Sequence, residues 1–310
     1  MRWVTYVSPS DGAERAGLLR DGQVRGFDAA LVDLLPDLAA AADRDPAEVV
    51  PEAGVVLRAP VPRPPSVRDF LSFEEHACNA SAAFGREVPP VWYEQPVFYF
   101  TNPAAVRGTG EPVPVSPGSA AFDYEVEVAA VVGRGGSDLT PEEAEAAIAG
   151  YTVFVDWSAR DVQRVESQVG LGPAKGKDGA TTLGPVVVTP DELEPYRSGA
   201  GYALRMAAEV DGVEQGGGSW ADIHWSFGQM LAYASRGTEL RPGDVVGSGT
   251  VGTGCLLELR SLHGEERHPW LRPGVEVAVT VERIGTVTAP IVAGPDPVPL
   301  GPGMTAATTS

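Results

Sequence analysis

The segment Phe122-Asp-Tyr-Glu-Val-Glu-Val-Ala-Ala-Val-Val132 carries the strongest structural signal in the chain. Side chains on a β-strand point to alternate faces, so Asp123, Glu125 and Glu127 are predicted to share one face of a strand. Crowded carboxylates beside an apolar run repel one another and lose hydration unless a cation joins them. The pattern favours a divalent-cation site, with a solvated acidic face on an edge strand as the alternative.

Two further acids extend this pattern. Asp156 ends an apolar strand predicted over residues 151–155, where a carboxylate either caps the following helical segment or points into a site. Asp69 precedes His76 by seven residues. Oxygen ligands suit Mg²⁺, Mn²⁺ or Ca²⁺, whereas Zn²⁺ favours more His and Cys than the four histidines and two cysteines here supply.

Short alternating stretches separated by glycine and proline predict a β-rich mixed α/β fold. The expected strands cover residues 3–7, 18–20, 23–27, 122–132, 151–155, 186–188, 204–210, 245–248, 275–281 and 286–292. One predicted helix covers residues 29–42 and breaks at Pro36. A second covers residues 140–148 and stops at Gly150.

The proline-dense stretch Arg58-Ala-Pro-Val-Pro-Arg-Pro-Pro65 can continue neither a helix nor a central strand. We therefore predict a small β-rich N-terminal domain over residues 1–62 and a main domain over residues 63–292. Residues 293–310, which are rich in Pro, Gly, Ala and Thr, are expected to form an extended or disordered tail.

Composition argues against some classes of function. The chain has 310 residues, 43% of them hydrophobic, which is enough for a sizeable core. With 42 acidic and 23 basic side chains, its formal charge of −19 opposes binding to nucleic acid or to anionic membranes. No stretch approaches the roughly 20 apolar residues of a membrane span. Because the first residues also lack the apolar run of a signal peptide, we expect a cytoplasmic protein.

Four segments of the chain, taken together, resemble the fumarylacetoacetate hydrolase family. They are DYEVEV at 123–128, DWSARDVQ at 156–163, LGPAKGKDGATTLGP at 171–185 and PGDVVGSGTVGTG at 242–254. Their order and spacing cover residues of roughly 66–292. The resemblance implies the family's β-sandwich roll for the main domain, usually assembled as a homodimer, with Mg²⁺ or Ca²⁺ at its open end.

The resemblance also implies which residues hold the metal. The family's metal-binding carboxylates fall on Glu125, Glu127 and Asp156. In the two-domain members that cleave fumarylacetoacetate, a further acidic ligand lies seven residues before a catalytic histidine, and Asp69 and His76 reproduce that spacing.

The same members pair the histidine with a glutamate from a late strand, which is Glu258 here. Many single-domain acylpyruvate hydrolases instead place the partner glutamate three residues after the histidine, where this chain has Asn79. The departure favours the Glu258 arrangement and therefore the two-domain members.

Hydrolysis of a β-diketone needs a nucleophilic water at one carbonyl and stabilisation of the enolate that leaves. We assign water activation to His76, with Glu258 orienting its ring. If residues 156–163 form one helix, then Asp156, Arg160 and Gln163 lie on one face of it. Further candidates for binding the oxyanion, the leaving group or the substrate are Arg160, Gln163, Lys177, Tyr99 and Thr250.

The sequence thus predicts a divalent-metal-dependent hydrolase that cleaves a carbon–carbon bond in a small fumarylacetoacetate-like or acylpyruvate-like keto acid. A decarboxylase, or a tautomerase or isomerase, that uses the same metal and enolate chemistry is the first alternative. A homologue that binds a metabolite without catalysis is the second, although such a protein is expected to lose His76, Lys177 or an acidic ligand, and this chain keeps them.

Overall fold

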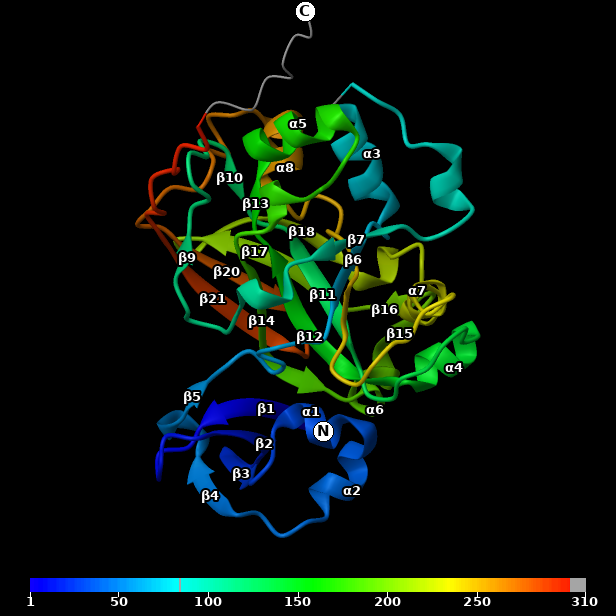
Figure 1. Ribbon diagram of the computed structural model, residues 1–310, viewed down its shortest axis with the longest axis vertical. Helices are drawn as coiled ribbons and strands as arrows, with labels where there is room; N and C mark the ends of the chain where they lie inside the picture. Colours follow the sequence, from blue (N-terminus) through cyan, green and yellow to red (C-terminus); the bar gives the residue numbers. More distant parts are fainter. Residues whose placement is uncertain (84, 302–310) are drawn as a thin grey trace, which may run out of the picture.

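Two β-sheets form the framework of the protein, whose computed structural model describes residues 1–83 and 85–301 (Figure 1). The strands of the larger sheet are β1 (Arg2–Val7), β2 (Glu14–Arg20), β3 (Gln23–Phe27), β4 (Glu48–Pro51), β5 (Val56–Leu57), β6 (Val67–Phe70), β7 (Phe98–Thr101), β8 (Val106–Arg107), β11 (Val126–Val132), β12 (Ile148–Asp156), β14 (Thr181–Val188) and β19 (Val245–Gly247). They pair in the order β4-β3-β2-β1-β14-β12-β11-β19-β6-β7, with β5 on β1 and β8 on β14.

The second sheet has the order β18-β17-β20-β21-β9, and two pairs of short strands complete the β-structure. These strands are β9 (Val113–Pro114), β10 (Phe122–Asp123), β13 (Ser158–Ala159), β15 (Arg197–Ser198), β16 (Gly201–Tyr202), β17 (Arg205–Val210), β18 (Val213–Ser219), β20 (Glu276–Val281) and β21 (Gly285–Val292). The α-helices are α1 (Leu31–Leu34), α2 (Leu38–Ala42), α3 (Glu74–Ala83), α4 (Pro141–Ala146), α5 (Arg160–Glu166), α6 (Pro190–Leu193), α7 (Phe227–Ala234) and α8 (Leu256–His263).

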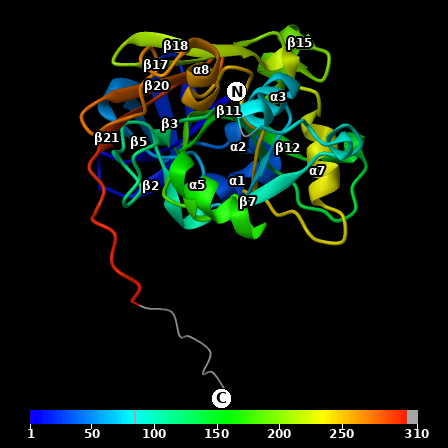
Figure 2. The same cartoon turned by 90° about the horizontal axis from the view of Figure 1, so that it is seen from above.

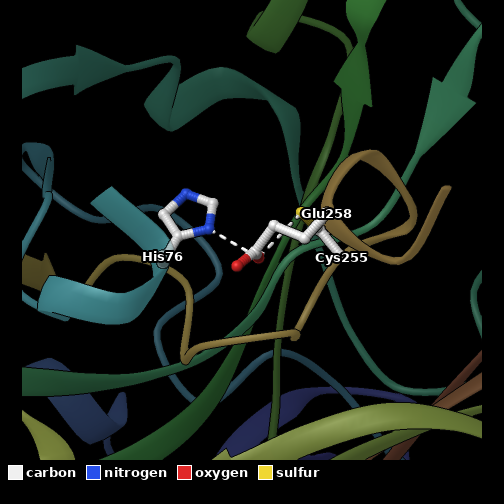
Figure 3. Close-up of side chains that lie close together, drawn as sticks. All are labelled: His76, Cys255 and Glu258. Atoms are coloured by element: carbon white, nitrogen blue, oxygen red, sulfur yellow. Dashed lines mark hydrogen bonds and ion pairs between the residues drawn. The ribbon is translucent and has the colours of Figure 1, made fainter. Parts of the chain in front are cut away.

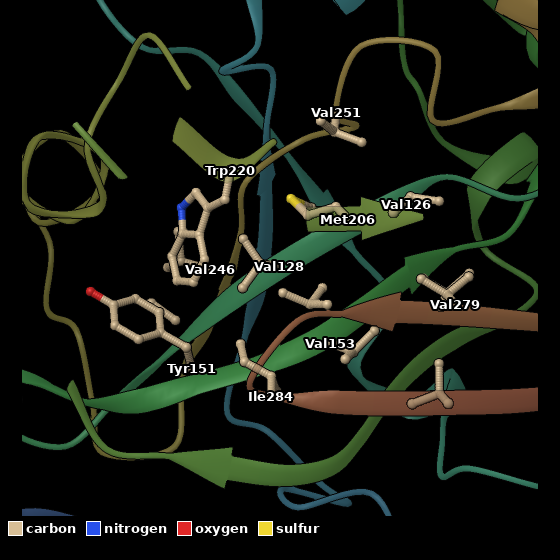
Figure 4. Packing of buried hydrophobic residues seen from close by; sticks show 14 of the residues in the cluster. Val126, Val128, Tyr151, Val153, Met206, Trp220, Val246, Val251, Val279 and Ile284 are labelled. Carbon is tan, nitrogen blue, oxygen red and sulfur yellow. The ribbon is translucent and has the colours of Figure 1, made fainter. Parts of the chain in front are cut away.

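The main core lies where the two sheets pack face to face (Figure 4). Val128 of β11 and Val153 of β12 are fully buried and share this core with Val279 of β20. Burying a side chain of this size contributes about 1.5–3 kcal/mol. The predicted β-rich mixed fold with a preceding β-region is confirmed, because alternate residues on both sheets supply the apolar face.

The N-terminal strands continue the larger sheet. Trp3 of β1 pairs with Val187 of β14 in antiparallel register. A second core under α1 and α2 also takes in Val131 of β11. The N-terminal region therefore shares both hydrogen bonds and apolar contacts with the main sheet, and its division from the rest at residue 62 stays a prediction.

The predicted strand over residues 122–132 is interrupted, which corrects the expectation of one continuous acidic face. β10 ends at Asp123 and β11 begins at Val126. The Asp123 carboxylate accepts hydrogen bonds from the backbone N–H groups of Leu256 (2.8 Å) and Leu257 (3.0 Å), the first residues of α8. Asp123 therefore binds the N-terminus of a helix, and it is not one of the carboxylates that cluster around Glu125.

The two predicted helices exist with different bounds. The first breaks where expected, because a 3₁₀ turn containing Pro36 separates α1 from α2. The second ends at Ala146, and Gly150 lies inside β12 instead of stopping the helix. A Cβ at Gly150 would lie 2.5 Å from the carbonyl oxygen of Val188, so close approach of β14 explains this glycine.

The two ends of the main sheet differ in what covers them. In Figure 1 the N-terminal region lies at the lower end, whereas α3, α5 and α8 lie at the upper end. Figure 2 looks down on this upper end, where the three helices lie around β11. Of the predicted tail, residues 293–301 contain no helix or strand, and residues 302–310 lie outside the described residues. No helix among the described residues is long and apolar enough to cross a membrane.

Candidate active site

Four buried carboxylates gather at the helix-covered end of the larger sheet. Asp69 lies on β6, Glu127 on β11 and Asp156 at the end of β12, while Glu125 directly precedes β11. One oxygen atom from each of the four lies within 4.8 Å of the others, and none of these residues is more than 5% exposed. The structure therefore brings together all four residues that were predicted to bind a metal.

Two glycines make room for this cluster. Gly247 on β19 pairs with Asp69, and a Cβ there would lie 2.6 Å from Asp69 Oδ1 and 3.1 Å from Glu127 Oε2. Gly249 has a φ of 78°, and its N–H donates to Glu127 Oε2 at 2.9 Å. The close approach of backbone and carboxylates explains these two glycines of the segment at 242–254.

Two buried cations partly neutralise the carboxylates. Lys177 uses all three ammonium donors, on Glu125 (2.5 Å), Asp156 (2.6 Å) and the Ser158 hydroxyl (2.9 Å). Ser158 lies in the DWSARDVQ segment but was not among the predicted site residues. Arg160 binds Asp123 and Glu125, each at 2.8 Å.

The cations act unequally on the four carboxylates. Burial alone would raise the pKa of Glu125, but Lys177 and Arg160 outweigh burial and hold that pKa well below its ordinary value. Burial and the adjacent carboxylates instead raise the pKa of Glu127 well above its ordinary value. Burial raises the pKa of Asp156 to about 8, even beside Lys177. The cluster therefore holds more negative charge than the protein itself neutralises.

The cluster fits a divalent metal ion of the hard, oxygen-binding kind. Asp69 Oδ1, Glu127 Oε1 and Asp156 Oδ1 are buried and have no hydrogen-bond partner among the described residues, and the same is true of the Thr250 hydroxyl. Unpaired buried oxygens are costly, and a cation would satisfy them. Because every donor is an oxygen, Mg²⁺, Mn²⁺ and Ca²⁺ suit the site better than Zn²⁺.

Metal binding is expected to stabilise the protein. A metal at 100 times its dissociation constant adds about 2.7 kcal/mol to the free energy of unfolding. For a chain of this size that amounts to a rise in Tm of about 4 °C. The rise should be larger at pH 8 than at pH 5.5, because protons compete for the carboxylates. Differential scanning fluorimetry with MgCl₂, MnCl₂, CaCl₂ or EDTA measures it, and the same Tm in all four would contradict the metal site.

His76 and Glu258 form a buried, hydrogen-bonded pair (Figure 3). His76 Nδ1 lies 2.7 Å from Glu258 Oε2, which leaves Nε2 free of this contact. Burial lowers the pKa of His76, but attraction to the Glu258 carboxylate and their hydrogen bond outweigh it and raise the pKa above its ordinary value. Glu258 thus stabilises the protonated imidazole.

Glu258 lies on α8, which corrects the expectation of a late strand. The cause is Asp123, whose carboxylate accepts from the first two N–H groups of that helix. Three more groups donate to Glu258: Asn79 Nδ2 at 3.0 Å, the Thr253 N–H at 3.1 Å and Cys255 Sγ at 3.2 Å. Position 79 carries the partner glutamate in the single-domain pattern. Here it is Asn79, whose side-chain amide donates to Glu258, the glutamate that takes over this role.

One cavity of about 290 Å³ is lined both by carboxylates of the cluster and by His76, whereas Asp156 and Glu258 do not line it. Among the predicted residues, the lining includes Asp69, His76, Tyr99, Glu125, Glu127, Arg160, Gln163, Lys177 and Thr250. The Tyr99 hydroxyl contacts Asp69 at 2.7 Å and also Asp156. It is therefore held by the carboxylate cluster as well as facing the cavity.

The predicted helix over residues 156–163 is wrong in its first part. Asp156 ends β12, and α5 begins only at Arg160, because Ser158 and Ala159 pair with β10. Arg160 and Gln163 do lie on one helix, and Arg160 donates to Gln163 Oε1 at 3.3 Å. The amide N–H₂ of Gln163 is thereby left for another acceptor.

Residues 66–292 match the model of the C-terminal domain of fumarylacetoacetate hydrolase, which is most of the chain. The chain belongs to the fumarylacetoacetate hydrolase family. A rice fumarylacetoacetase (Oryza sativa subsp. japonica) is 30% identical over 268 residues, covering 68% of this chain and 62% of the rice protein. The match thus spans less than two thirds of that relative.

Other members of the fumarylacetoacetate hydrolase family carry different names. An oxaloacetate tautomerase of Bacillus subtilis is 29% identical over 241 residues, covering 76% of this chain and 72% of that protein. The crystal structure of a 5-carboxymethyl-2-hydroxymuconate delta-isomerase from Mycobacterium smegmatis has a TM-score of 0.71 at 25% identity, covering 95% of this chain and 100% of that one. Family membership alone therefore does not choose between hydrolysis and isomerisation.

Proposed function

We propose that this protein is a divalent-metal-dependent hydrolase that cleaves a carbon–carbon bond in a small β-diketo acid of the acylpyruvate or fumarylacetoacetate type. The observation that carries the proposal is that His76, which is paired with the buried Glu258, lines the same cavity as the carboxylates Asp69, Glu125 and Glu127. Hydrolysis requires a base for water, whereas tautomerisation consumes no water. A non-catalytic homologue would have no need to keep such a pair buried.

His76 is proposed as the general base. When Glu258 accepts the proton of Nδ1, the neutral ring carries a lone pair on Nε2, which can accept a proton from water. The hydroxide oxygen then adds to the acyl carbonyl carbon. Glu258 stabilises the imidazolium that results, and its four hydrogen-bond donors keep its carboxylate in place.

Cleavage then breaks the bond between the acyl carbon and the adjacent carbon of the keto acid. The bonding electron pair becomes an enolate, which takes up a proton, so the products are a carboxylic acid and a keto acid. The proton can return from His76, or from Lys177, whose ammonium lies in the cavity wall. A metal held by Asp69, Glu125, Glu127 and Asp156 would supply Lewis-acid stabilisation of the enolate charge.

The remaining polar groups of the cavity are proposed to position the substrate. The Gln163 amide can donate to the oxyanion formed by water addition, because its oxygen already accepts from Arg160. The unpaired Thr250 hydroxyl can donate to a substrate carboxylate. The homodimer and the cytoplasmic location expected from the sequence stay predictions.

A tautomerase is the second candidate function. The Bacillus tautomerase is matched over 72% of its length, against 62% for the rice fumarylacetoacetase. In this candidate, Lys177 and the carboxylates would transfer the proton at an enolisable carbon. This candidate predicts that His76 is dispensable for turnover.

Product analysis separates the two candidates. We would follow loss of enol absorbance for fumarylacetoacetate, several acylpyruvates and oxaloacetate, with Mg²⁺ or with EDTA, and identify the products by mass spectrometry. EDTA-sensitive formation of two acid fragments would establish the hydrolase. Formation of carbon dioxide, or of a tautomer alone, would overturn it.

Glu258→Gln is expected to change the pH profile as well as the rate. Glu258 raises the pKa of His76. In the wild type, His76 therefore becomes protonated, and stops acting as a base, at a higher pH than it would without Glu258. Removing the carboxylate lowers the pKa of His76, and the acidic limb of kcat/KM should therefore move to lower pH. Rates measured between pH 5 and pH 9 test this. An acidic limb that does not move would contradict the pairing of these residues in catalysis.

A further inference from the structure

The cavity wall has a charged part and an apolar part. Besides the carboxylates and their cations, it includes the hydrophobic side chains Leu71, Ala80, Val97, Phe98 and Leu257. They come from α3, α8, β7 and the residues next to β6 and β7, so part of the space beside His76 is apolar. At about 290 Å³ the cavity is at the small end for a ligand site, which limits the length of what fits.

The cations of the described lining are already engaged. All three donors of Lys177 are used by Glu125, Asp156 and Ser158. Arg160 is bound to Asp123 and Glu125. Arg68 lies close to Phe98, with its guanidinium carbon 5.8 Å from the centre of the Phe98 ring and 5.3 Å from that of Phe100. Arg68 itself does not line the cavity.

A substrate with two carboxylates would therefore meet an unfavourable environment. One carboxylate, on the keto-acid end, can be bound beside the metal ligands, Gln163 and Thr250. A second carboxylate on the acyl end would lie among apolar side chains without a cation, and burying an unpaired charge is strongly disfavoured. An alkyl group in the same place would gain from leaving water.

We propose that the enzyme prefers keto acids with a single carboxylate and a short uncharged acyl chain over dicarboxylic substrates such as fumarylacetoacetate. This inference rests on the proposed hydrolase function, and it narrows the class of substrate. The acyl chain packs against Ala80, Phe98 and Leu257. The similarity to fumarylacetoacetases therefore extends to the reaction but not to the preferred acyl group.

Butyrylpyruvate and succinylpyruvate form a matched pair of probes, because they share a carbon skeleton and differ in a terminal methyl or carboxylate group. Wild-type kcat/KM, measured with Mg²⁺ by loss of diketone absorbance, is expected to be at least about tenfold higher for butyrylpyruvate. Equal values, or faster hydrolysis of succinylpyruvate, would overturn the inference and leave the hydrolase function standing. Hydrolysis of neither compound would instead count against the hydrolase function itself.

Ala80→Arg tests the position of the acyl end. Ala80 is half-buried on α3, where a long side chain can keep its charged group near water. The variant should shift the ratio of the two kcat/KM values toward succinylpyruvate by about tenfold, because a carboxylate there gains a charged partner. Ala80→Gln has a similar size without the charge and is the control for folding and crowding. An unchanged ratio in Ala80→Arg would contradict the placement of the acyl chain beside α3.

Discussion

Replacing His76 with alanine is expected to lower kcat for carbon–carbon cleavage by about 10²–10⁴-fold, the usual contribution of a general base. The metal-induced rise in Tm should remain, because His76 is not among the four clustered carboxylates. Glu258 would keep its hydrogen bonds from Asn79, Thr253 and Cys255, so the surroundings of the pair should hold their structure. Steady-state rates and a thermal-shift titration on the same preparation measure both effects.

His263→Ala is a suitable control, since this histidine is exposed at the end of α8, the helix that carries Glu258. It should leave kcat unchanged. Cleavage at the wild-type rate in His76→Ala would show that His76 is not the base. Loss of the metal response would show that the substitution had damaged the site as a whole.

Glu127→Gln is expected to reduce metal-dependent turnover by more than about 100-fold, a loss at least as large as that from altering a partner of a metal ligand. The same variant without metal should be as stable as the metal-free wild type or more stable. Burial and adjacent carboxylates raise the pKa of Glu127, which means that its charge is unfavourable in the fold. An amide of the same shape can still accept from Gly249 N–H and can donate to a neighbouring carboxylate.

Glu125→Gln provides the contrast. Lys177 and Arg160 hold the pKa of Glu125 below its ordinary value, so its charge is favourable. Removing one partner of a buried ion pair costs about 3–5 kcal/mol. Glu125→Gln should therefore lose both activity and stability. Denaturant unfolding of both variants with EDTA, and activity with Mg²⁺, measure these effects. A loss of stability in Glu127→Gln equal to that in Glu125→Gln would contradict the charge imbalance in the cluster.

Strand periodicity was sufficient to place part of the carboxylate cluster. Glu125 and Glu127 are two residues apart, and both reach the same cluster. Asp156 is the last residue of the apolar strand β12, which pairs with β11, and this explains why an acid at that strand end points into the site. Asp69 and His76 came from spacing within a family pattern, which periodicity alone does not supply.

Local patterns failed where a distant residue decides the conformation. Glu258 lies in a Leu-rich stretch that is compatible with a strand or a helix. The deciding contact is Asp123, which lies more than 100 residues earlier and caps α8. The same tertiary contact removes Asp123 from the acidic face. Ser158 and Asn79 were not assigned to the site for a related reason, since their partners Lys177 and Glu258 are distant in sequence.

The parallel pairing of β6 with β19 has a consequence for how the protein acquires activity. Val67 pairs with Val245, so about three quarters of the main domain lies between two adjacent strands in the sequence. Contacts of such long sequence separation form slowly, because a long loop must close before they contribute. Asp69 arrives at the cluster only with this pairing. Enzymatic activity during refolding should therefore lag behind the appearance of β-structure, which makes turnover a reporter of the completed fold.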